Sequence, residues 1–250
     1  MKSSDAIPFC KVCFKEMNFD CLSSVYANNN ICASCFEAME PGMRKIRLDR
    51  WIGYYLYPYN ETLRKMIYDF KGCYDYELRD VFLSRQKEYL KMLFRGYVLV
   101  PAPSHESHDE KRGFNHVIEI YKELKLPILP LIKKTKDVKQ SDQHFDDRKK
   151  IGSALEMKNG ESLKGKKVLF VDDILTSGST ARACLSLIEK EKPKRIRFLV
   201  LTKTMPKERK DGKSKNNKII CKMRLFLEKI KTKTKKKSSW KISFIAYHLW

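Results

Sequence analysis

The segment from Val168 to Thr180 constrains the fold of this chain more than any other part of the sequence. It begins with four apolar residues, continues with the neighbouring carboxylates Asp172 and Asp173, and ends in a short run of hydroxyl residues around Gly178. An uninterrupted apolar run predicts a strand that is buried on both faces, which is typical of a parallel sheet covered by helices. In such sheets ligands bind at the carboxyl ends of the strands, where these two carboxylates fall. The segment therefore predicts an α/β fold with a ligand site at the end of this strand.

Further short apolar runs alternate with helical stretches around this segment, which favours a parallel sheet flanked by helices. We expect strands at 97–100, 128–132 and 196–201, and helices at 117–124 and 180–191. Upstream, the stretch 51–94 contains aromatic residues followed by apolar residues at helical spacing. We interpret it as two helices around a break at Lys71 and Gly72.

Four of the eight cysteines form two pairs with metal-site spacing. Cys10 and Cys13 form one pair, Cys32 and Cys35 form the other, and two residues separate the cysteines of each pair. Each short turn brings two sulfurs close enough to bind one metal ion, so the two turns together complete a tetrahedral zinc site. A closed site of four thiolates is structural and stabilises a segment too small for its own core. The alternative is four reduced, buried cysteines, and we interpret Cys21 as a spare thiol.

Composition limits the class of protein. Hydrophobic residues make up 42% of the 250 residues, and no stretch is apolar enough to predict a membrane span or an export signal. We therefore expect a globular, cytoplasmic protein. The net charge of +22 is uneven, because 16 of the 52 Lys and Arg and only 3 of the 30 acidic residues follow position 202. The rest of the chain is moderately basic, which suits a phosphate-rich small ligand, a nucleic acid or both.

The residues at the end of the central strand suit a phosphorylated sugar. Gly178 lets the backbone approach a phosphate closely, and the amides of a helix start donate to its oxygens together with neighbouring hydroxyls. These hydroxyls belong to Thr176, Ser177, Ser179 and Thr180. Asp172 and Asp173 can accept hydrogen bonds from vicinal hydroxyls and bind a divalent cation. An acidic strand end followed by an ordinary helix cap is the alternative, while the lack of a Gly-Lys-Ser/Thr sequence argues against a nucleoside triphosphatase.

Val168 to Thr180 resembles the phosphoribosyl pyrophosphate (PRPP) motif of type I phosphoribosyltransferases, in which the acidic pair binds the ribose hydroxyls and the loop binds the 5′-phosphate. Other segments resemble the ComF family, whose members also carry an N-terminal four-cysteine module. These segments are Val100-Pro-Ala-Pro103, Lys111-Arg-Gly-Phe-Asn115, the hood segment from Arg64 to Gly72, and the positions of Gln140 and Arg148. His116 and Ile151 depart from the Gln and Asn that are usual in that family.

The resemblance implies roles for individual residues. The loop with Ala102 and Ser104 would face the pyrophosphate, and Lys111 and Arg112 would be its counter-charges, for which a bidentate guanidinium is well suited. A solvated surface pair is the alternative for these two residues. Together with Asp172 and Asp173 they would form the catalytic set of a transferase that uses Mg²⁺, which the acidic pair would bind with the substrate. The stretch 133–150 matches in position a mobile loop that closes over the substrate.

Two functions follow from the ComF resemblance. The first is a phosphoribosyltransferase of nucleoside metabolism with an unknown acceptor, linked to natural competence. The second is a non-catalytic protein of DNA uptake that binds single-stranded DNA, with PRPP only as a ligand and competence helicase-type proteins as partners. We expect a zinc module at 1–45, a phosphoribosyltransferase-like domain at 46–203 with its hood at 46–95, and a basic tail at 204–250. The tail is either a disordered, solvated end or an arm for nucleic acid.

Overall fold

The computed structural model describes residues 9–17, 30–134, 155–158 and 163–205. The contacts within the chain divide it into a unit of residues 1–205 and a unit of residues 206–250. The second unit, and with it nearly all of the basic tail, lies outside the described residues. None of the helices in the described ranges has the length and apolar character needed to cross a membrane.

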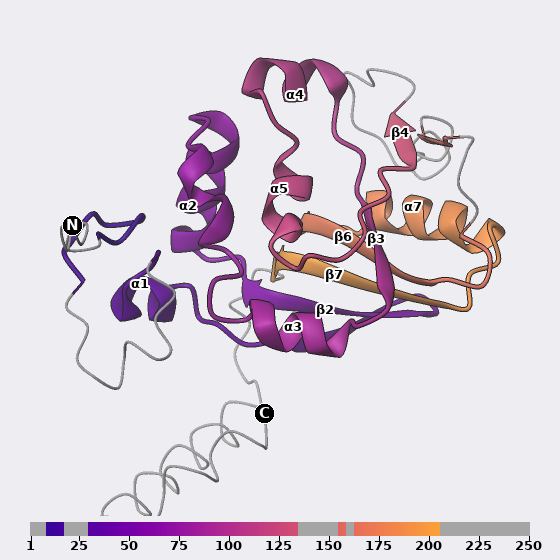
Figure 1. Cartoon of the computed structure of the whole chain (residues 1–250), viewed down its shortest axis with the longest axis horizontal. Helices are drawn as coiled ribbons and strands as arrows, with labels where there is room; N and C mark the ends of the chain where they lie inside the picture. The colour runs from indigo at the N-terminus through magenta and orange to yellow at the C-terminus, as the bar shows by residue number, and fades with distance from the viewer. Residues whose placement is uncertain (1–8, 18–29, 135–154, 159–162, 206–250) are drawn as a thin grey trace, which may run out of the picture. The chain divides into compact units, whose positions relative to one another are not determined.

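Within the described part of the chain, five strands form the central sheet, in the order β1-β2-β7-β6-β3 (Figure 1). The strands are β1 (Arg44–Leu48), β2 (Trp51–Pro58), β3 (Tyr97–Pro101), β6 (Lys167–Leu175) and β7 (Arg195–Lys203). β2, β7, β6 and β3 run parallel, and β1 pairs with β2 as an antiparallel edge strand. This mostly parallel sheet confirms the predicted α/β fold.

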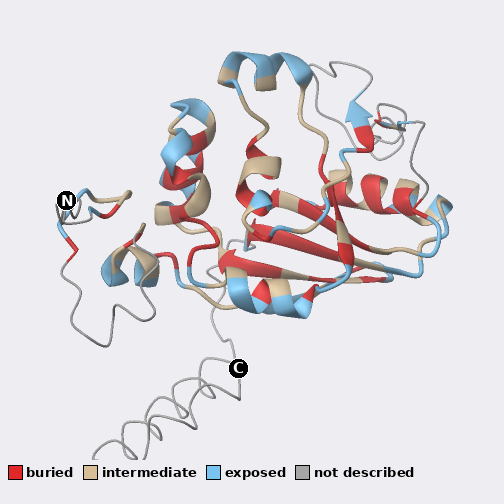
Figure 2. Cartoon of the chain, viewed as in Figure 1, coloured by how far each residue is buried: buried red, intermediate tan, exposed pale blue. Residues whose placement is uncertain are grey.

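Helices cover both faces of the sheet and enclose two clusters of buried side chains. One cluster joins the sheet to α2 (Glu61–Gly72), α3 (Lys87–Leu93) and α5 (His116–Lys122). The other joins it to α7 (Ser179–Lys190) and to the short strands β4 (Ile132–Lys134) and β5 (Leu155–Met157). Figure 2 shows that the buried residues are concentrated in the central strands and on the helix faces turned toward them. The remaining elements are α1 (Ala33–Ala38), the 3-10 helix η1 (Tyr76–Asp80) and α4 (Glu106–Arg112).

Strand β6 contributes to both clusters, because successive side chains of a strand point to opposite faces. Leu169 and Val171 pack in the cluster of α2 and α5, whereas Val168 and Phe170 pack in the cluster of α7. The same alternation directs the side chains of consecutive residues 172 and 173 to opposite sides of the sheet.

Most predicted elements are confirmed, with ends displaced by a few residues. The strands at 97–100 and 196–201 are β3 and β7, and the helices at 117–124 and 180–191 are α5 and α7. The predicted strand at 128–132 is reduced to a bridge between Ile128 and Leu99, followed by β4. Pro127 and Pro130 account for this difference, because each lacks the N–H that a regular ladder requires.

Two further differences lie upstream. The aromatic stretch at 51–58 is strand β2, whose residues are buried on both faces, so its sequence lacks the alternation by which a strand is recognised. The predicted second helix is split into η1 and α3. All four residues at 81–84, between these elements, are buried. A continuous helix would expose some of them, because its residues point in all directions around the axis.

Candidate functional site

The acidic pair lies within β6, close to its C-terminal end, and its two carboxylates have different surroundings. Asp173 is 6% exposed, and its Oδ2 lies 2.5 Å from Lys71 Nζ and 3.3 Å from His116 Nε2. Asp172 accepts a hydrogen bond of 2.9 Å from the amide of Asp173. Burial and then the charge of Asp173 raise the pKa of Asp172 well above its ordinary value. Burial also acts to raise the pKa of Asp173, but the hydrogen bond from His116 and the charge of Lys71 outweigh it and lower this pKa. Asp173 is therefore the member of the pair that ionises more readily.

The segment from Arg112 to Asn115 joins α4 to α5 in a tight turn. Gly113 has a φ of 80°, the left-handed conformation that glycine adopts without strain at the end of a helix. Asn115 caps α5, because its side chain accepts a hydrogen bond from a backbone amide in the first turn. Phe114 stacks at 5.0 Å on Phe70 of α2. The turn thus brings the end of α4 beside the start of α5 and anchors both to the hood helix.

Arg112 and Lys111 occupy different environments, although the sequence treats them as a pair. The side chain of Arg112 is 8% exposed, and its Nη1 lies 3.2 Å from Asp109 Oδ1 and 3.1 Å from His116 Nδ1. Its Nε donates to the backbone oxygen of Lys71 at 3.1 Å. Lys111 is exposed. In the structure described here, Arg112 is bonded within the protein, and Lys111 faces solvent.

The loop from Thr176 to Thr180 wraps around the start of α7. Gly178 precedes the helix with a φ of 75°, and a Cβ at this position would lie 2.9 Å from a methyl carbon of Leu48. The hydroxyls of Ser177 and Ser179 lie 2.9 Å apart. This loop presents hydroxyl groups beside the first turn of α7, where the amide of Ser179 donates to Ser177 Oγ at 3.3 Å, and a helix start of this kind suits an anion.

Arg182 is a cation beside this loop that the sequence interpretation did not identify. Its Nη1 donates to the backbone oxygen of Ser177 at 2.8 Å, and its Nε lies 3.0 Å from Asp49 Oδ2 in the turn between β1 and β2. The position of Arg182 in the first turn of a helix that follows the loop is the signal in the sequence from which it could have been found.

The loop containing Ala102 and Ser104 follows β3 and is bound to its neighbours. The amide of Ala102 donates to Val171 of β6 at 2.8 Å, and the hydroxyl of Ser104 donates to Asp109 Oδ1 at 2.7 Å. A cavity of about 110 Å³ adjoins the loop. Three lysines that the sequence interpretation did not single out also line this cavity, namely Lys133, Lys134 and Lys158. Gln140, Arg148 and Ile151 lie outside the described residues.

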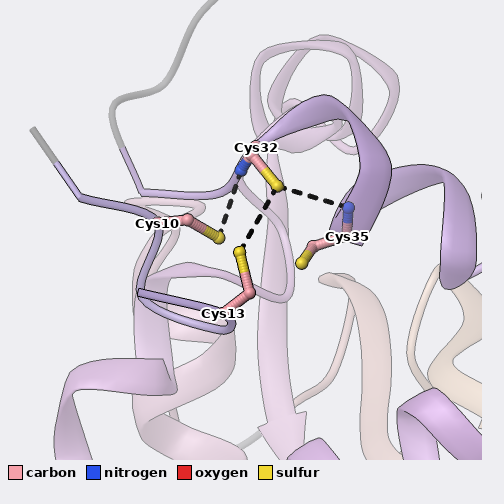
Figure 3. Close-up of side chains that lie close together, drawn as sticks. All are labelled: Cys10, Cys13, Cys32 and Cys35. Atoms are coloured by element: carbon pink, nitrogen blue, oxygen red, sulfur yellow. Dashed lines mark hydrogen bonds between the residues drawn. The ribbon is translucent and has the colours of Figure 1, made fainter. Parts of the chain in front are cut away.

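The four predicted zinc ligands form a compact cluster (Figure 3). All four sulfurs lie within 4.8 Å of one another, and those of Cys13 and Cys32 are 3.8 Å apart. A tetrahedral zinc ion with bonds of about 2.3 Å places its sulfur ligands about 3.8 Å apart, so the cluster fits zinc. The sulfurs come from the turn after Phe9 and from the first turn of α1. Cys21 lies outside the described residues.

Backbone amides favour the thiolate form of one cysteine in this cluster, which is the form that binds a cation. The amide of Cys32 donates to the sulfur of Cys10 at 3.3 Å. Burial acts to raise the pKa of Cys10, but the amides of Cys32, Cys13 and Val12 outweigh it and lower this pKa to about 7. Burial raises the pKa of Cys35. One thiolate therefore forms near neutral pH, and a bound metal favours the others, because only the deprotonated sulfur is a ligand.

Comparison with known proteins relates one continuous segment of the chain to a family. Residues 110–233 match the family model of the phosphoribosyl transferase domain. The chain therefore contains a phosphoribosyltransferase domain, which agrees with its α/β fold. No curated protein matches the chain.

Several solved phosphoribosyltransferases resemble the chain at low identity. A hypoxanthine phosphoribosyltransferase of Staphylococcus aureus is 15% identical, with a TM-score of 0.36 over 56% of this chain and 70% of that chain. A hypoxanthine-guanine phosphoribosyltransferase of Bacillus anthracis is 17% identical, with a TM-score of 0.36 over 56% and 76% of the two chains. The hypoxanthine phosphoribosyl transferase of Trypanosoma cruzi is 14% identical, with a TM-score of 0.36 over 56% and 71%.

Proposed function

We propose that the chain is a ComF-like protein that binds PRPP with Mg²⁺ and transfers the phosphoribosyl group to an acceptor. One observation carries this proposal: a half-buried and a buried carboxylate lie side by side near the end of a central parallel strand, and a hydroxyl loop with a glycine before a helix follows the strand directly. The carboxylates suit a sugar diol, and the loop suits a phosphate. The phosphoribosyl transferase domain matched over residues 110–233 supports the same chemistry.

In this proposal, different residues of the chain bind different parts of the substrate. Asp173 and Asp172 would accept hydrogen bonds from the ribose hydroxyls. The loop residues would hold the 5′-phosphate, with Arg182 fixing their backbone; these residues are Thr176, Ser177, Gly178, Ser179 and Thr180. The other end of the substrate, the pyrophosphate, would lie at the loop of Ala102 and Ser104. Such contacts hold the sugar and its leaving group in fixed positions, which lowers the entropic part of the barrier.

The transfer breaks the bond between C1 of the ribose and the pyrophosphate oxygen, while the acceptor forms a new bond to C1. Negative charge grows on the pyrophosphate, so cations and amides placed there beforehand stabilise the transition state. Lys111 is exposed and free to turn toward the substrate, and Lys133, Lys134 and Lys158 line the cavity beside the loop. Arg112 would contribute its charge from its buried position. Bound Mg²⁺, held through Asp172 and Asp173, would neutralise further charge on the leaving group.

We propose three parts of the chain, with boundaries at 1–45, 46–203 and 204–250. The first part would be a structural zinc module whose core is shared with the transferase domain. Cys10 and Met39 are fully buried in the same cluster as α2 and α5. Lys11 forms ion pairs of 2.9 Å with Asp80 and 3.0 Å with Glu77 of the hood. A bound zinc ion would therefore stabilise the hood as well as the module.

Isothermal titration of PRPP in the presence of Mg²⁺ tests the proposal. We expect binding by the natural chain and its loss when Asp172→Asn and Asp173→Asn are combined. Glu88→Gln is the control, because its side chain is 76% exposed and lies on α3, outside the site. Release of pyrophosphate is then measured over a panel of bases and amines. Absence of binding by the natural chain contradicts the proposal, and binding without release over the whole panel favours a ligand-binding protein over an enzyme.

A second candidate function, binding of single-stranded DNA, is favoured by exposed aromatic side chains. Phe14 is 72% exposed and Tyr68 is 65% exposed, and both line a cleft of about 730 Å³ between the zinc module and α2. Exposed aromatic rings are the surfaces on which unpaired bases stack. Competence helicase-type proteins would be partners in this role.

The dependence on salt separates two modes of DNA binding. The cations of the cleft are paired with acids, as Lys65 is with Asp69 at 2.7 Å, so stacking in the cleft would depend only weakly on salt. Binding through the basic tail would fall steeply with salt. Labelled single strands are therefore titrated at several salt concentrations against the natural chain, a Phe14→Ala and Tyr68→Ala variant, and a chain that ends at residue 203. Weak, unchanged binding in all three excludes both modes.

A further inference from the structure

A closed ring of hydrogen bonds joins four elements around the proposed ribose site. Lys71 Nζ lies 2.5 Å from Asp173 Oδ2, and His116 Nε2 lies 3.3 Å from the same oxygen. His116 Nδ1 lies 3.1 Å from Arg112 Nη1. Arg112 Nε closes the ring by donating to the backbone oxygen of Lys71 at 3.1 Å. The hood helix α2, the end of α4, the start of α5 and strand β6 thus meet in one polar network.

The chemistry of the ring determines where the imidazole proton lies. A guanidinium group only donates hydrogen bonds, so Nδ1 of His116 must accept from Arg112. The proton of the neutral imidazole is then on Nε2, which faces Asp173. His116 therefore accepts on one side and donates on the other, and it holds the carboxylate of Asp173 in a fixed orientation.

Three of the four side chains of the ring are buried, which makes their geometry costly to disturb, and Lys71 is half-buried. The side chains of Arg112, His116 and Asp173 are 8%, 9% and 9% exposed. A buried polar group that loses its partner bears the full desolvation cost, so these bonds form or break together.

Asp109 extends this network to the loop proposed for the pyrophosphate. Its Oδ1 accepts from Arg112 Nη1 at 3.2 Å and from the hydroxyl of Ser104 at 2.7 Å. Its Oδ2 accepts from the side-chain amide of Asn115 at 2.8 Å. An unbroken chain of bonds therefore runs from Ser104 through Asp109, Arg112 and His116 to Asp173.

We propose that Asp109 and His116 are positioning residues that couple the two halves of the PRPP site, the ribose half at Asp173 and the pyrophosphate half at Ser104. This inference rests on the proposed function. A ligand in one half restrains the network, so the other half is already ordered when its own ligand arrives. The coupling is reciprocal, because each ligand must change the affinity of the other by the same factor.

The two halves are tested with two probes, ribose 5-phosphate and pyrophosphate, both with Mg²⁺. The affinity for ribose 5-phosphate is measured by isothermal titration without pyrophosphate and with saturating pyrophosphate. We expect pyrophosphate to raise it by about 5-fold or more in the natural chain, the lower end of typical allosteric couplings. The reverse titration should give the same factor.

Variants of His116 separate positioning from a merely structural role. In His116→Leu both hydrogen bonds are lost, so the coupling factor should fall close to 1. In His116→Gln an amide can accept from Arg112 and donate to Asp173, so the coupling should be largely restored. His108→Leu is the matched control, since His108 is an exposed residue of α4, and its coupling should equal that of the natural chain.

Asp109→Asn provides a second route in case the leucine variant does not fold. It keeps one acceptor oxygen but removes the charge that holds Arg112 and Ser104 together, so the coupling factor should also fall. If the natural chain binds neither probe, the proposed function is overturned and the coupling with it. If it binds both probes but their affinities are independent, or if His116→Leu and Asp109→Asn leave the factor unchanged, only the coupling is overturned.

Discussion

At the scale of single residues, the site depends on two adjacent carboxylates that the fold treats differently. Asp173 has Lys71 and His116 beside it, whereas Asp172 is half-buried next to a charged neighbour. Two adjacent carboxyl groups are costly to ionise together, because their charges repel each other. In this protein only one of them has basic partners, so that one ionises more readily. The pair thus combines an ionised acceptor with a carboxyl group that would lose its proton on binding a cation.

This difference predicts how ligand binding depends on pH. Because the pKa of Asp172 is raised, binding of Mg²⁺ with PRPP through this carboxylate must release its proton, and the affinity should increase as pH rises toward that pKa. Titrations in two buffers of different ionisation enthalpy measure the proton release. Asp172→Asn should bind more weakly and release no proton. An affinity that falls with rising pH in the natural chain would contradict the assignment of Asp172 as a ligand.

The two carboxylates act on folding stability in opposite directions. The lowered pKa of Asp173 stabilises the folded state above the ordinary carboxyl pKa, and this stabilisation is lost as pH falls through the folded value. The raised pKa of Asp172 favours the folded state below the ordinary carboxyl pKa, and this contribution is lost as pH rises through the folded value. Ionisation of Asp172 therefore costs stability, which a cation bound to this carboxylate would restore.

At the scale of elements, the backbone before α7 lies very close to strand β1. Gly178 has a φ of 75°, and its missing side chain leaves room for Leu48 of β1. The hydroxyl loop is thus held between the helix and the edge hairpin, which sets the position at which an anion would meet the amides of the first turn.

Two glycine substitutions separate backbone strain from contact at this point. Gly96→Ala places a side chain in open space at a φ of 77°, so it should destabilise the fold by about 1 kcal/mol through strain alone. Gly178→Ala adds the contact with Leu48 at 2.9 Å and should cost more. Denaturant unfolding measures both, and PRPP titration should show weaker binding only for Gly178→Ala. Equal losses of stability for the two variants would mean that Leu48 moves aside freely.

At the scale of the whole unit 1–205, the cysteine cluster and the transferase domain share one core. Cys10, Ile31 and Met39 are buried in the cluster that α2 and α5 also enter. Arg85, which follows η1, stacks at 4.8 Å on Phe36 of α1. Loss of order in the first part should therefore reach the hood, whose Lys71 is bonded to the acidic pair.

Removal of zinc tests this connection. Metal analysis should find one zinc ion per chain. A strong chelator should lower the melting temperature. It should also weaken PRPP binding, because α2, which carries Lys71, packs against the cysteine cluster. Cys13→Ser should reproduce both effects. Cys73→Ser is the control, since Cys73 is exposed and lies outside the cluster, and it should change neither. Unchanged ligand affinity after complete removal of the metal would show that the two parts act independently.

The sequence by itself determined the local features. The apolar run of β6, the carboxylates after it, the glycine before α7 and the spacing of the cysteines all depend on neighbours in the chain, so their patterns predict their structures. The α/β class followed from the alternation of such elements. Strand β2 escaped prediction, because burial on both faces removes the alternation that marks a strand.

Only the tertiary structure decided the surroundings of the acidic pair. Lys71, Asp109 and His116 lie 102, 64 and 57 positions before Asp173 along the chain, and no local pattern relates them. These residues come together because α2 and α5 pack against one face of the sheet and the turn at Gly113 joins α4 to α5. The same packing turns Arg112 into the protein and away from the partnership with Lys111 that the sequence suggested. Burial and long-range pairing set these roles, because the energy of a charge depends on what surrounds it and not on its place in the sequence.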